Sequence, residues 1–169
     1  FLKPGPGWGG SCFPKDTRAL VRIAEQGGYD FRFLDGVIAV NEEQFSRIAD
    51  KVRDAVGGDL TGRTVGVWGL TFKAGTDDLR ESPALSVIQR LTSAGASVRA
   101  YDPTVNVVGD LPSGHDTVDL AGTALSACDG ADALVVLTEW DEFRWQDPAE
   151  VAALMTSLTV VDARNLLDR

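Results

Sequence analysis

Short apolar runs alternate with helical patterns after Gly62, and this alternation constrains the fold more than any other feature. The apolar runs cover residues 64–68, 97–101, 133–137 and 158–161, and the helical patterns cover residues 83–94, 123–128 and 148–156. Strands that alternate with helices usually pair in parallel, with helices on both faces of the sheet. We therefore predict a Rossmann-like parallel-sheet domain over residues 61–169, with a polar, loop-rich connection after Pro103.

The residues before Gly62 carry helical periodicity only. Their apolar spacing predicts a helix over residues 14–26 and a longer one over about 31–56, each ended by a pair of glycines. A chain of 169 residues is long enough for one domain and part of another. We predict the α/β class, with an all-helical segment over residues 1–60 that contains the long helix and precedes the sheet domain.

The apolar stripe of the long helix has two interpretations. It could pack inside its own chain, or it could form the interface of a homodimer through residues 31–56, which is the arrangement we expect. Asn41 lies within this stripe, either as a buried polar contact or as an exposed side chain.

The first ten residues are rich in glycine and proline and predict an irregular loop. Because the sequence begins inside this loop, with neither Met nor a helix-start signal, we expect it to be a piece of a longer polypeptide. Cys12 follows the loop at the start of the first predicted helix, where the helix dipole and free N–H groups favour a thiolate. Asp16, one turn further along the same face, could assist proton transfer or water activation.

A cysteine that serves packing alone is the alternative interpretation of Cys12. The glycines before it favour the nucleophile, because they let the backbone approach a ligand closely. Cys128, on a short amphipathic helix, is expected in the core.

The turn over residues 69–82 lies where open α/β sheets bind their ligands. It lacks the G-x-G-x-x-G pattern of a dinucleotide-binding turn. Lys73 and Arg80 supply cations there, and Arg164 supplies another after the last strand. One such cation alone would indicate a surface charge, but three that converge at strand ends predict an anionic small-molecule ligand.

The composition argues against several partners. A formal net charge of -9 disfavours nucleic acid and anionic membranes, because an acidic surface repels phosphate groups. No apolar run is long enough to cross a bilayer. Two distant cysteines predict no disulfide framework and favour the cytoplasm, and a single histidine without clustered cysteines predicts no metal site.

Two segments of the sequence together resemble the UDP-glucose/GDP-mannose dehydrogenase family. The stretch from Gly7 to Asp16, spelled GWGGSCFPKD, is similar to the family's catalytic-cysteine motif. The stretch from Gly69 to Ser82 is similar to the start of its C-terminal nucleotide-sugar domain. The two motifs stand in the family's order with the long helix between them, so the resemblance covers essentially the whole chain.

The resemblance implies an activity. Family members oxidise the C6 alcohol of a nucleotide sugar twice with NAD+, through a thiohemiacetal and a thioester on the cysteine. Cys12 is then the nucleophile, and Asp16 assists water or the oxyanion. The NAD domain, and the lysine, asparagine and glutamate that complete proton transfer, would precede Phe1, so we expect that this piece alone does not turn over.

The resemblance also implies ligand contacts. Phe72 and Lys73 would contact the nucleotide and phosphate, and Arg80 would reach NAD across the domain interface. Arg164 would meet the substrate from the partner subunit. The remaining contacts would lie along the sugar nucleotide and comprise Phe1, Lys3 and the backbone from Gly5 to Gly9.

Other functions stay open at this point. The spelling of the cysteine motif favours UDP-glucose, but GDP-mannose or a UDP-N-acetylhexosamine is an alternative substrate. A non-catalytic nucleotide-binding module is a second class. A true NAD-binding Rossmann domain over residues 64–169 is a third. The first turn, which lacks the G-x-G-x-x-G pattern, argues against it.

Overall fold

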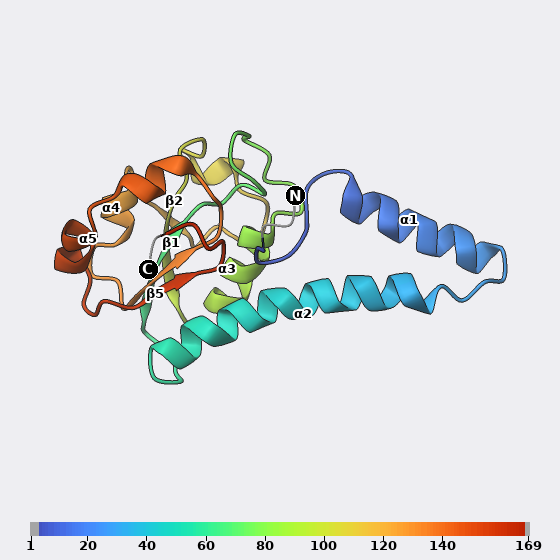
Figure 1. The fold of residues 1–169 in the computed structure, drawn as a ribbon, viewed down its shortest axis with the longest axis horizontal. Coiled ribbons are helices and arrows are strands. Elements are labelled where there is room, and N and C mark those ends of the chain that lie inside the picture. Colours follow the sequence, from blue (N-terminus) through green and yellow to red (C-terminus); the bar gives the residue numbers. More distant parts are fainter. Residues whose placement is uncertain (1–3, 168–169) are drawn as a thin grey trace.

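A computed structural model describes residues 4–167 and is drawn in Figure 1. Five strands form one parallel sheet in the order β3-β2-β1-β4-β5. The strands are β1 (Thr64–Trp68), β2 (Ser97–Tyr101), β3 (Asp119–Leu120), β4 (Ala133–Val136) and β5 (Val160–Asp162). The helices are α1 (Phe13–Gln26), α2 (Arg32–Ala55), α3 (Pro83–Ser93), α4 (Ala124–Ala127) and α5 (Pro148–Leu154), with 3-10 turns at Val108–Asp110 and Asp141–Trp145. The predicted α/β class, a helical segment before a Rossmann-like sheet, is confirmed.

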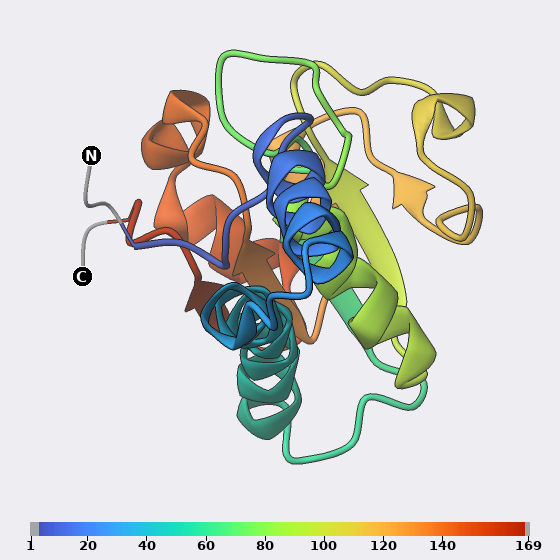
Figure 2. The same ribbon diagram turned by 90° about the vertical axis from the view of Figure 1, so that its right-hand side faces the viewer.

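Helices α1 and α2 form a hairpin that projects beyond the sheet, and only the second half of α2 lies against it (Figures 1 and 2). Phe45, Ile48 and Val52 in that half are buried in the core beside α3. In the projecting half, the side chain of Phe33 is 77% exposed and that of Val40 is 51% exposed. The second half of the long helix therefore packs in the core, and its first half exposes apolar side chains.

Strand β1 is buried on both faces of the sheet, which explains its continuous apolar sequence. Val65 and Val67 pack in the cluster that contains α2 and α3. Trp68 packs in the opposite cluster, beneath α4 and α5. Gly66 faces α4 closely, because a Cβ atom there would lie 2.7 Å from the carbonyl oxygen of Ala127.

The structure departs from the sequence-based expectations at the two edges of the sheet. The sequence does not predict β3, which is only two residues long and therefore has no detectable alternation. At the other edge, β5 begins at Val160 rather than at residue 158, and Leu158 is 67% exposed before it. Among the described residues, no helix is long and apolar enough to span a bilayer.

Candidate functional site

The glycine-rich segment from Pro4 to Ser11, called here the glycine loop, lies along the carboxyl edge of the sheet. Gly5 packs so closely on the Arg164 side chain that a Cβ atom would collide with the guanidinium. Gly10, at φ +89°, packs on the ring of Phe72, which a Cβ atom would approach to 3.0 Å. The loop thus joins the end of β5 to the turn after β1, and side chains at these glycines would push it away from the sheet.

Cys12 follows the glycine loop and is the residue immediately before helix α1. Its side chain is exposed and lies 3.7 Å from Ser11 Oγ, measured at Sγ. Pro14 stands in the first turn of the helix, as predicted. The thiol therefore has access to solvent at the start of a helix.

Asp16 lies one turn after Cys12, and its backbone N–H donates to the Cys12 carbonyl at 2.9 Å. Its side chain is 67% exposed and lies 3.6 Å from Lys15 Nζ. The two predicted catalytic residues are therefore neighbours in one turn of chain, with the carboxylate pointing to solvent.

Asn41, whose role the sequence left open, is buried and fastens the glycine loop to α2. Its Oδ1 accepts from the Trp8 backbone N–H at 2.8 Å, and its Nδ2 donates to the Trp8 carbonyl at 3.0 Å. Gly7, at φ +143°, leaves the room for this contact, since a Cβ atom would lie 2.7 Å from Asn41 Oδ1. Beside the contact, a groove of about 700 Å³ runs between the loop and the first half of α2.

Glu81 fastens the loop from the side of the sheet domain. It is one of two non-glycine residues with positive φ in the described part of the chain, at φ 49°. In this conformation its carbonyl accepts from the Gly10 N–H at 3.2 Å. Its carboxylate pairs with both terminal nitrogens of Arg18 on α1, at 3.0 and 3.1 Å, and this pairing lowers the pKa of Glu81.

The turn between β1 and α3 holds three of the predicted ligand contacts. Lys73 is exposed, with Nζ 5.2 Å from the centre of the Phe72 ring. Arg80 is also exposed, and Asp78 accepts from its Nε and Nη2 atoms at 2.9 Å each. The pKa of Arg80 is raised by this hydrogen bonding and by the charge of Asp78, and less by the charge of Cys12. Arg80 therefore lies within the electrostatic reach of the thiol.

Arg164 is the third cation, and the turn after β5 positions it. Asp162 accepts from the Arg164 backbone N–H at 2.8 Å, and the Arg164 side chain pairs with Glu139. Burial lowers the pKa of the guanidinium. Arg164 lies against Gly5 of its own chain, and its predicted role toward the substrate of a partner subunit stays a prediction.

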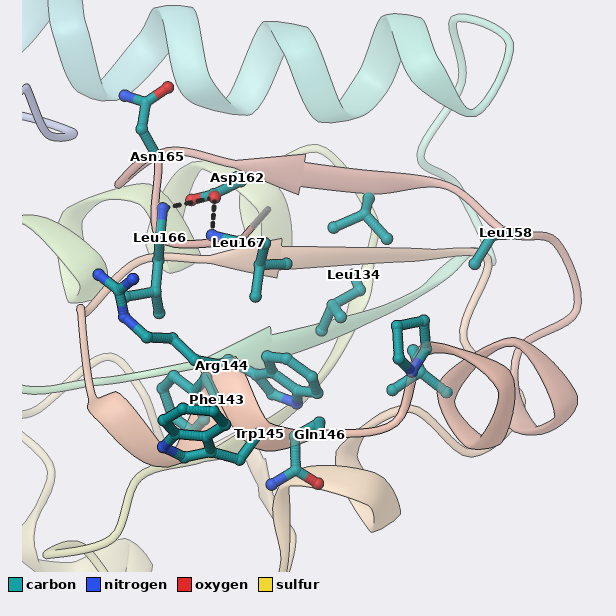
Figure 3. A pocket seen from close by; sticks show the side chains of 14 residues that line it. Leu134, Phe143, Arg144, Trp145, Gln146, Leu158, Asp162, Asn165, Leu166 and Leu167 are labelled. Atoms are coloured by element: carbon teal, nitrogen blue, oxygen red, sulfur yellow. Dashed lines mark hydrogen bonds between the residues drawn. The ribbon is translucent and has the colours of Figure 1, made fainter. Parts of the chain in front are cut away.

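A cavity of about 680 Å³ opens on the opposite face of the sheet, under β4, β5 and the turn that contains Trp145 (Figure 3). Leu134, Leu166 and Leu167 point into it, and Asp162 holds the turn by accepting from the Leu166 and Leu167 N–H groups at 2.6 and 2.8 Å. Its lining includes neither Cys12 nor Asp16.

The predicted site residues thus fall into two groups. The structure brings Cys12, Gly9, Phe72, Lys73 and Arg80 to one end of the glycine loop and Gly5 with Arg164 to the other. Phe1 and Lys3 lie outside the described residues. Within residues 4–167, no cluster of three His, Cys, Asp or Glu side chains is placed to hold a metal ion.

The sequence of this chain matches two domains of one known protein family. The UDP binding domain of the UDP-glucose/GDP-mannose dehydrogenase family matches residues 66–169, and the family's central domain matches residues 1–43. The UDP-glucose 6-dehydrogenase of Pseudomonas aeruginosa is 44% identical over 170 residues, covering 98% of this chain and 38% of that protein.

Solved structures agree. A UDP-glucose dehydrogenase from Pyrobaculum islandicum superposes with a TM-score of 0.80 at 34% identity, covering 96% of this chain and 35% of that one. An NDP-N-acetyl-D-galactosaminuronic acid dehydrogenase from Methanosarcina mazei gives 0.83 at 26% identity, covering 99% and 36%. This chain spans less than two fifths of the length of these relatives. The match over more than half of its residues shows that the chain belongs to the UDP-glucose/GDP-mannose dehydrogenase family.

Proposed function

We propose that this chain is the C-terminal part of a nucleotide-sugar 6-dehydrogenase that oxidises UDP-glucose to UDP-glucuronate. The observation that carries the proposal is the glycine loop, which places an exposed thiol at a helix start and reaches the strand ends that hold Lys73 and Arg164. A reacting carbon at one end and a diphosphate along the loop would fit this edge. The family match and the 44% identity to a UDP-glucose 6-dehydrogenase support the same reaction.

Cys12 performs the covalent step in this proposal. Its thiolate adds to the C6 aldehyde, forming a C–S bond, and the carbonyl oxygen takes a proton to give a thiohemiacetal. Loss of a hydride and a proton from this adduct leaves a thioester. Water then adds at C6, assisted by Asp16, the C–S bond breaks, and the thiol and the uronate are released. Covalent capture keeps the reactive aldehyde in the site between the two oxidations.

NAD+ supplies the chemistry of hydride acceptance in each oxidation, one molecule per step. The turn after β1 does not fit the cofactor's pyrophosphate, because the backbone N–H groups of Leu70 and Thr71 donate to the buried Asp102 carboxylate instead of facing solvent. We therefore place NAD on a part of the enzyme outside this chain. Arg80, exposed beside Cys12, is the residue of this chain that we assign to contact it.

The nucleotide end of the substrate is assigned to the sheet domain. We propose that Phe72 and Lys73 contact the nucleotide and phosphates and that Arg164 contacts the diphosphate beside Gly5. Phe1, Lys3 and the backbone from Gly5 to Gly9 would line the rest of the substrate. We also propose a central-domain part over residues 1–60 and a nucleotide-sugar domain over residues 61–169; the family matches over residues 1–43 and 66–169 support this division.

The test of the proposed function is turnover by the complete protein. We expect two NADH per UDP-glucose and loss of turnover in Cys12→Ala, while Cys128→Ala, at a fully buried thiol, serves as the control and keeps turnover. Unaffected turnover in Cys12→Ala would assign the nucleophile elsewhere. GDP-mannose and a UDP-N-acetylhexosamine, tested in parallel, decide the substrate, and binding of a nucleotide sugar without turnover of any would indicate a binding module.

Calorimetry on this polypeptide alone separates the half-sites. We expect UDP-glucose to bind without NAD binding, and no steady NADH production. Binding of NAD alone would overturn our interpretation of the sheet domain.

We further propose that the enzyme is a homodimer through α2, in the cytoplasm. The apolar side chains exposed on the projecting hairpin support the first statement. The two unpaired cysteines fit a reducing compartment.

A further inference from the structure

Asp102 is a fully buried carboxylate that the proposed reaction does not use. It stands directly after β2, next to β1 and close to the point where the strand order reverses between β1 and β4. Open α/β sheets bind ligands at such a point, and in dinucleotide-binding domains the backbone N–H groups of the first turn face a pyrophosphate. The neighbours of Asp102 therefore decide what this edge can bind.

Protein donors fill both oxygens of the carboxylate. Oδ2 accepts from the backbone N–H groups of Leu70 and Thr71 at 2.8 and 3.1 Å, and from Thr71 Oγ1 at 3.0 Å. It also accepts from Trp140 Nε1, in the segment after β4, at 3.1 Å. Oδ1 accepts from the N–H and the hydroxyl of Thr104 at 3.0 and 2.8 Å. A buried carboxylate satisfied in this way is stabilised in one geometry.

The same turn is held from the opposite side. Ser82 Oγ donates to the Leu70 carbonyl at 2.7 Å, and Thr138 Oγ1 donates to the Thr71 carbonyl at 2.6 Å. Gly69, at φ +94°, packs directly on Thr138, where a Cβ atom would collide. The backbone donors and acceptors of Leu70 and Thr71 are thus all paired within the protein.

We propose that Asp102 is a positioning residue that takes the place of a bound anion in the turn after β1 and thereby aims Phe72 and Lys73 at the nucleotide of the substrate. Phe72 and Lys73, the proposed nucleotide contacts, directly follow Thr71 in the chain. By holding Leu70 and Thr71, the Asp102 carboxylate therefore determines the position of the backbone from which these two side chains extend. The backbone N–H groups of Leu70 and Thr71, which in a dinucleotide-binding turn would bind the pyrophosphate, are already paired with Asp102. The side chains of Lys73 and Arg164 therefore bind the diphosphate of the substrate instead. This inference rests on the proposed function.

Asp102→Asn in the complete enzyme tests it. An amide nitrogen in the Oδ2 position would face the N–H groups of Leu70 and Thr71, and one in the Oδ1 position would face that of Thr104. In either case a backbone N–H loses its acceptor, and the bonds that remain to the turn lose the carboxylate charge. We expect the KM for the UDP-sugar and the inhibition constant of UDP to rise about tenfold or more, the equivalent of about 1.4 kcal/mol. The kcat and the KM for NAD should stay within about twofold of the wild type, because Cys12 lies outside the turn and Arg80, near its far end, is held by Asp78 rather than by Asp102.

Asp132→Asn is the matched control. Asp132 also accepts from a backbone N–H, that of Thr64 at 2.9 Å, and from Arg63, but at the amino edge of β1. It should lower thermal stability and leave the KM for the UDP-sugar unchanged. A raised KM in Asp102→Asn alone supports the proposal. Unchanged UDP affinity in folded Asp102→Asn, or an equal effect of both variants, overturns it.

Trp140→Phe and Thr71→Val decide the matter if Asp102→Asn does not fold. Each removes one donor to Oδ2 and leaves the carboxylate in place. A raised KM for the UDP-sugar in these variants supports the positioning role, and unchanged values contradict it. Turnover of UDP-glucose by the wild type is measured first, so a failure of the proposed function is distinguished from a failure of this inference.

Discussion

The two cysteines show how one side chain takes opposite characters from its surroundings. Cys12 is exposed at a helix start, whereas Cys128 is fully buried against α4, with Sγ donating to the Ala124 carbonyl at 3.5 Å. Burial raises the pKa of the Cys128 thiol to about 11. Below that pH the buried thiol keeps its proton, because desolvation disfavours the thiolate.

This difference predicts selective alkylation. Iodoacetamide at pH 8 should modify Cys12 and leave Cys128 unmodified in the folded protein, since only the exposed cysteine is accessible to the reagent. Mass spectrometry of the digested protein measures both sites, and unfolding in denaturant should expose the second. Equal modification of both cysteines under native conditions would contradict the burial of Cys128.

Asn41 determines the position of the glycine loop. Asn41→Ala should lower kcat for UDP-glucose in the complete enzyme by about tenfold, because the Trp8 backbone loses both partners, a cost of about 1–3 kcal/mol. Gln44→Ala is the control, since Gln44 lines the same groove. A kcat equal to that of the control would show that the loop holds its place without Asn41.

At the scale of elements, helix α4 can pack closely on β1 because Gly66 has no side chain. Gly66→Ala places a methyl group 2.7 Å from the Ala127 carbonyl oxygen, which is backbone and cannot rotate away. We expect a loss of about 1–3 kcal/mol in the free energy of unfolding. Gly36→Ala, on α2 with nothing within 4 Å of the new methyl group, should instead stabilise by about 0.5–1 kcal/mol. Denaturant titration of the two variants measures both signs, and equal effects would contradict the close α4–β1 contact.

Large apolar side chains are exposed in two parts of the whole molecule, the projecting hairpin and the sheet domain. The projecting hairpin exposes large apolar side chains on both helices, namely Phe13, Leu20, Ile23, Phe33 and Val40. A surface of this kind is typical of a binding interface and supports the proposed dimer. The sheet domain also exposes large apolar side chains, namely Trp145, Leu158 and Val160, which line the cavity on its other face.

Replacing exposed apolar side chains of the hairpin by carboxylates should therefore dissociate the proposed dimer. Phe33→Glu with Val40→Glu in the complete enzyme is expected to shift the mass measured by light scattering from dimer to monomer. Trp145→Glu is the control, because Trp145 is 81% exposed but lies on the other face of the sheet. A dimer that persists in the double variant would place the interface elsewhere.

Local sequence patterns alone predicted most of the helices and strands, though not β3. Periodicity and glycine pairs predicted α1, α2, β1 and β2 because these signals lie within a few residues of one another. Ser82, directly before the predicted helix over residues 83–94, caps α3, with its Oγ accepting from Ala84 N–H at 3.2 Å. Cys12 at the start of α1 is confirmed for the same reason, since a helix start is a local feature.

The long-range contacts of the candidate site are visible only in the tertiary structure. Asn41 meets Trp8 across 33 positions, and Asp102 meets Leu70 across 32. Both side chains look like ordinary polar residues in sequence, because burial and partner choice depend on the packed sheet. The strand order brings the ends of β1, β2 and β4 together, so a carboxylate after one strand can hold the turn after another. Sequence patterns report the period of each element, whereas these contacts depend on how the elements are placed relative to one another.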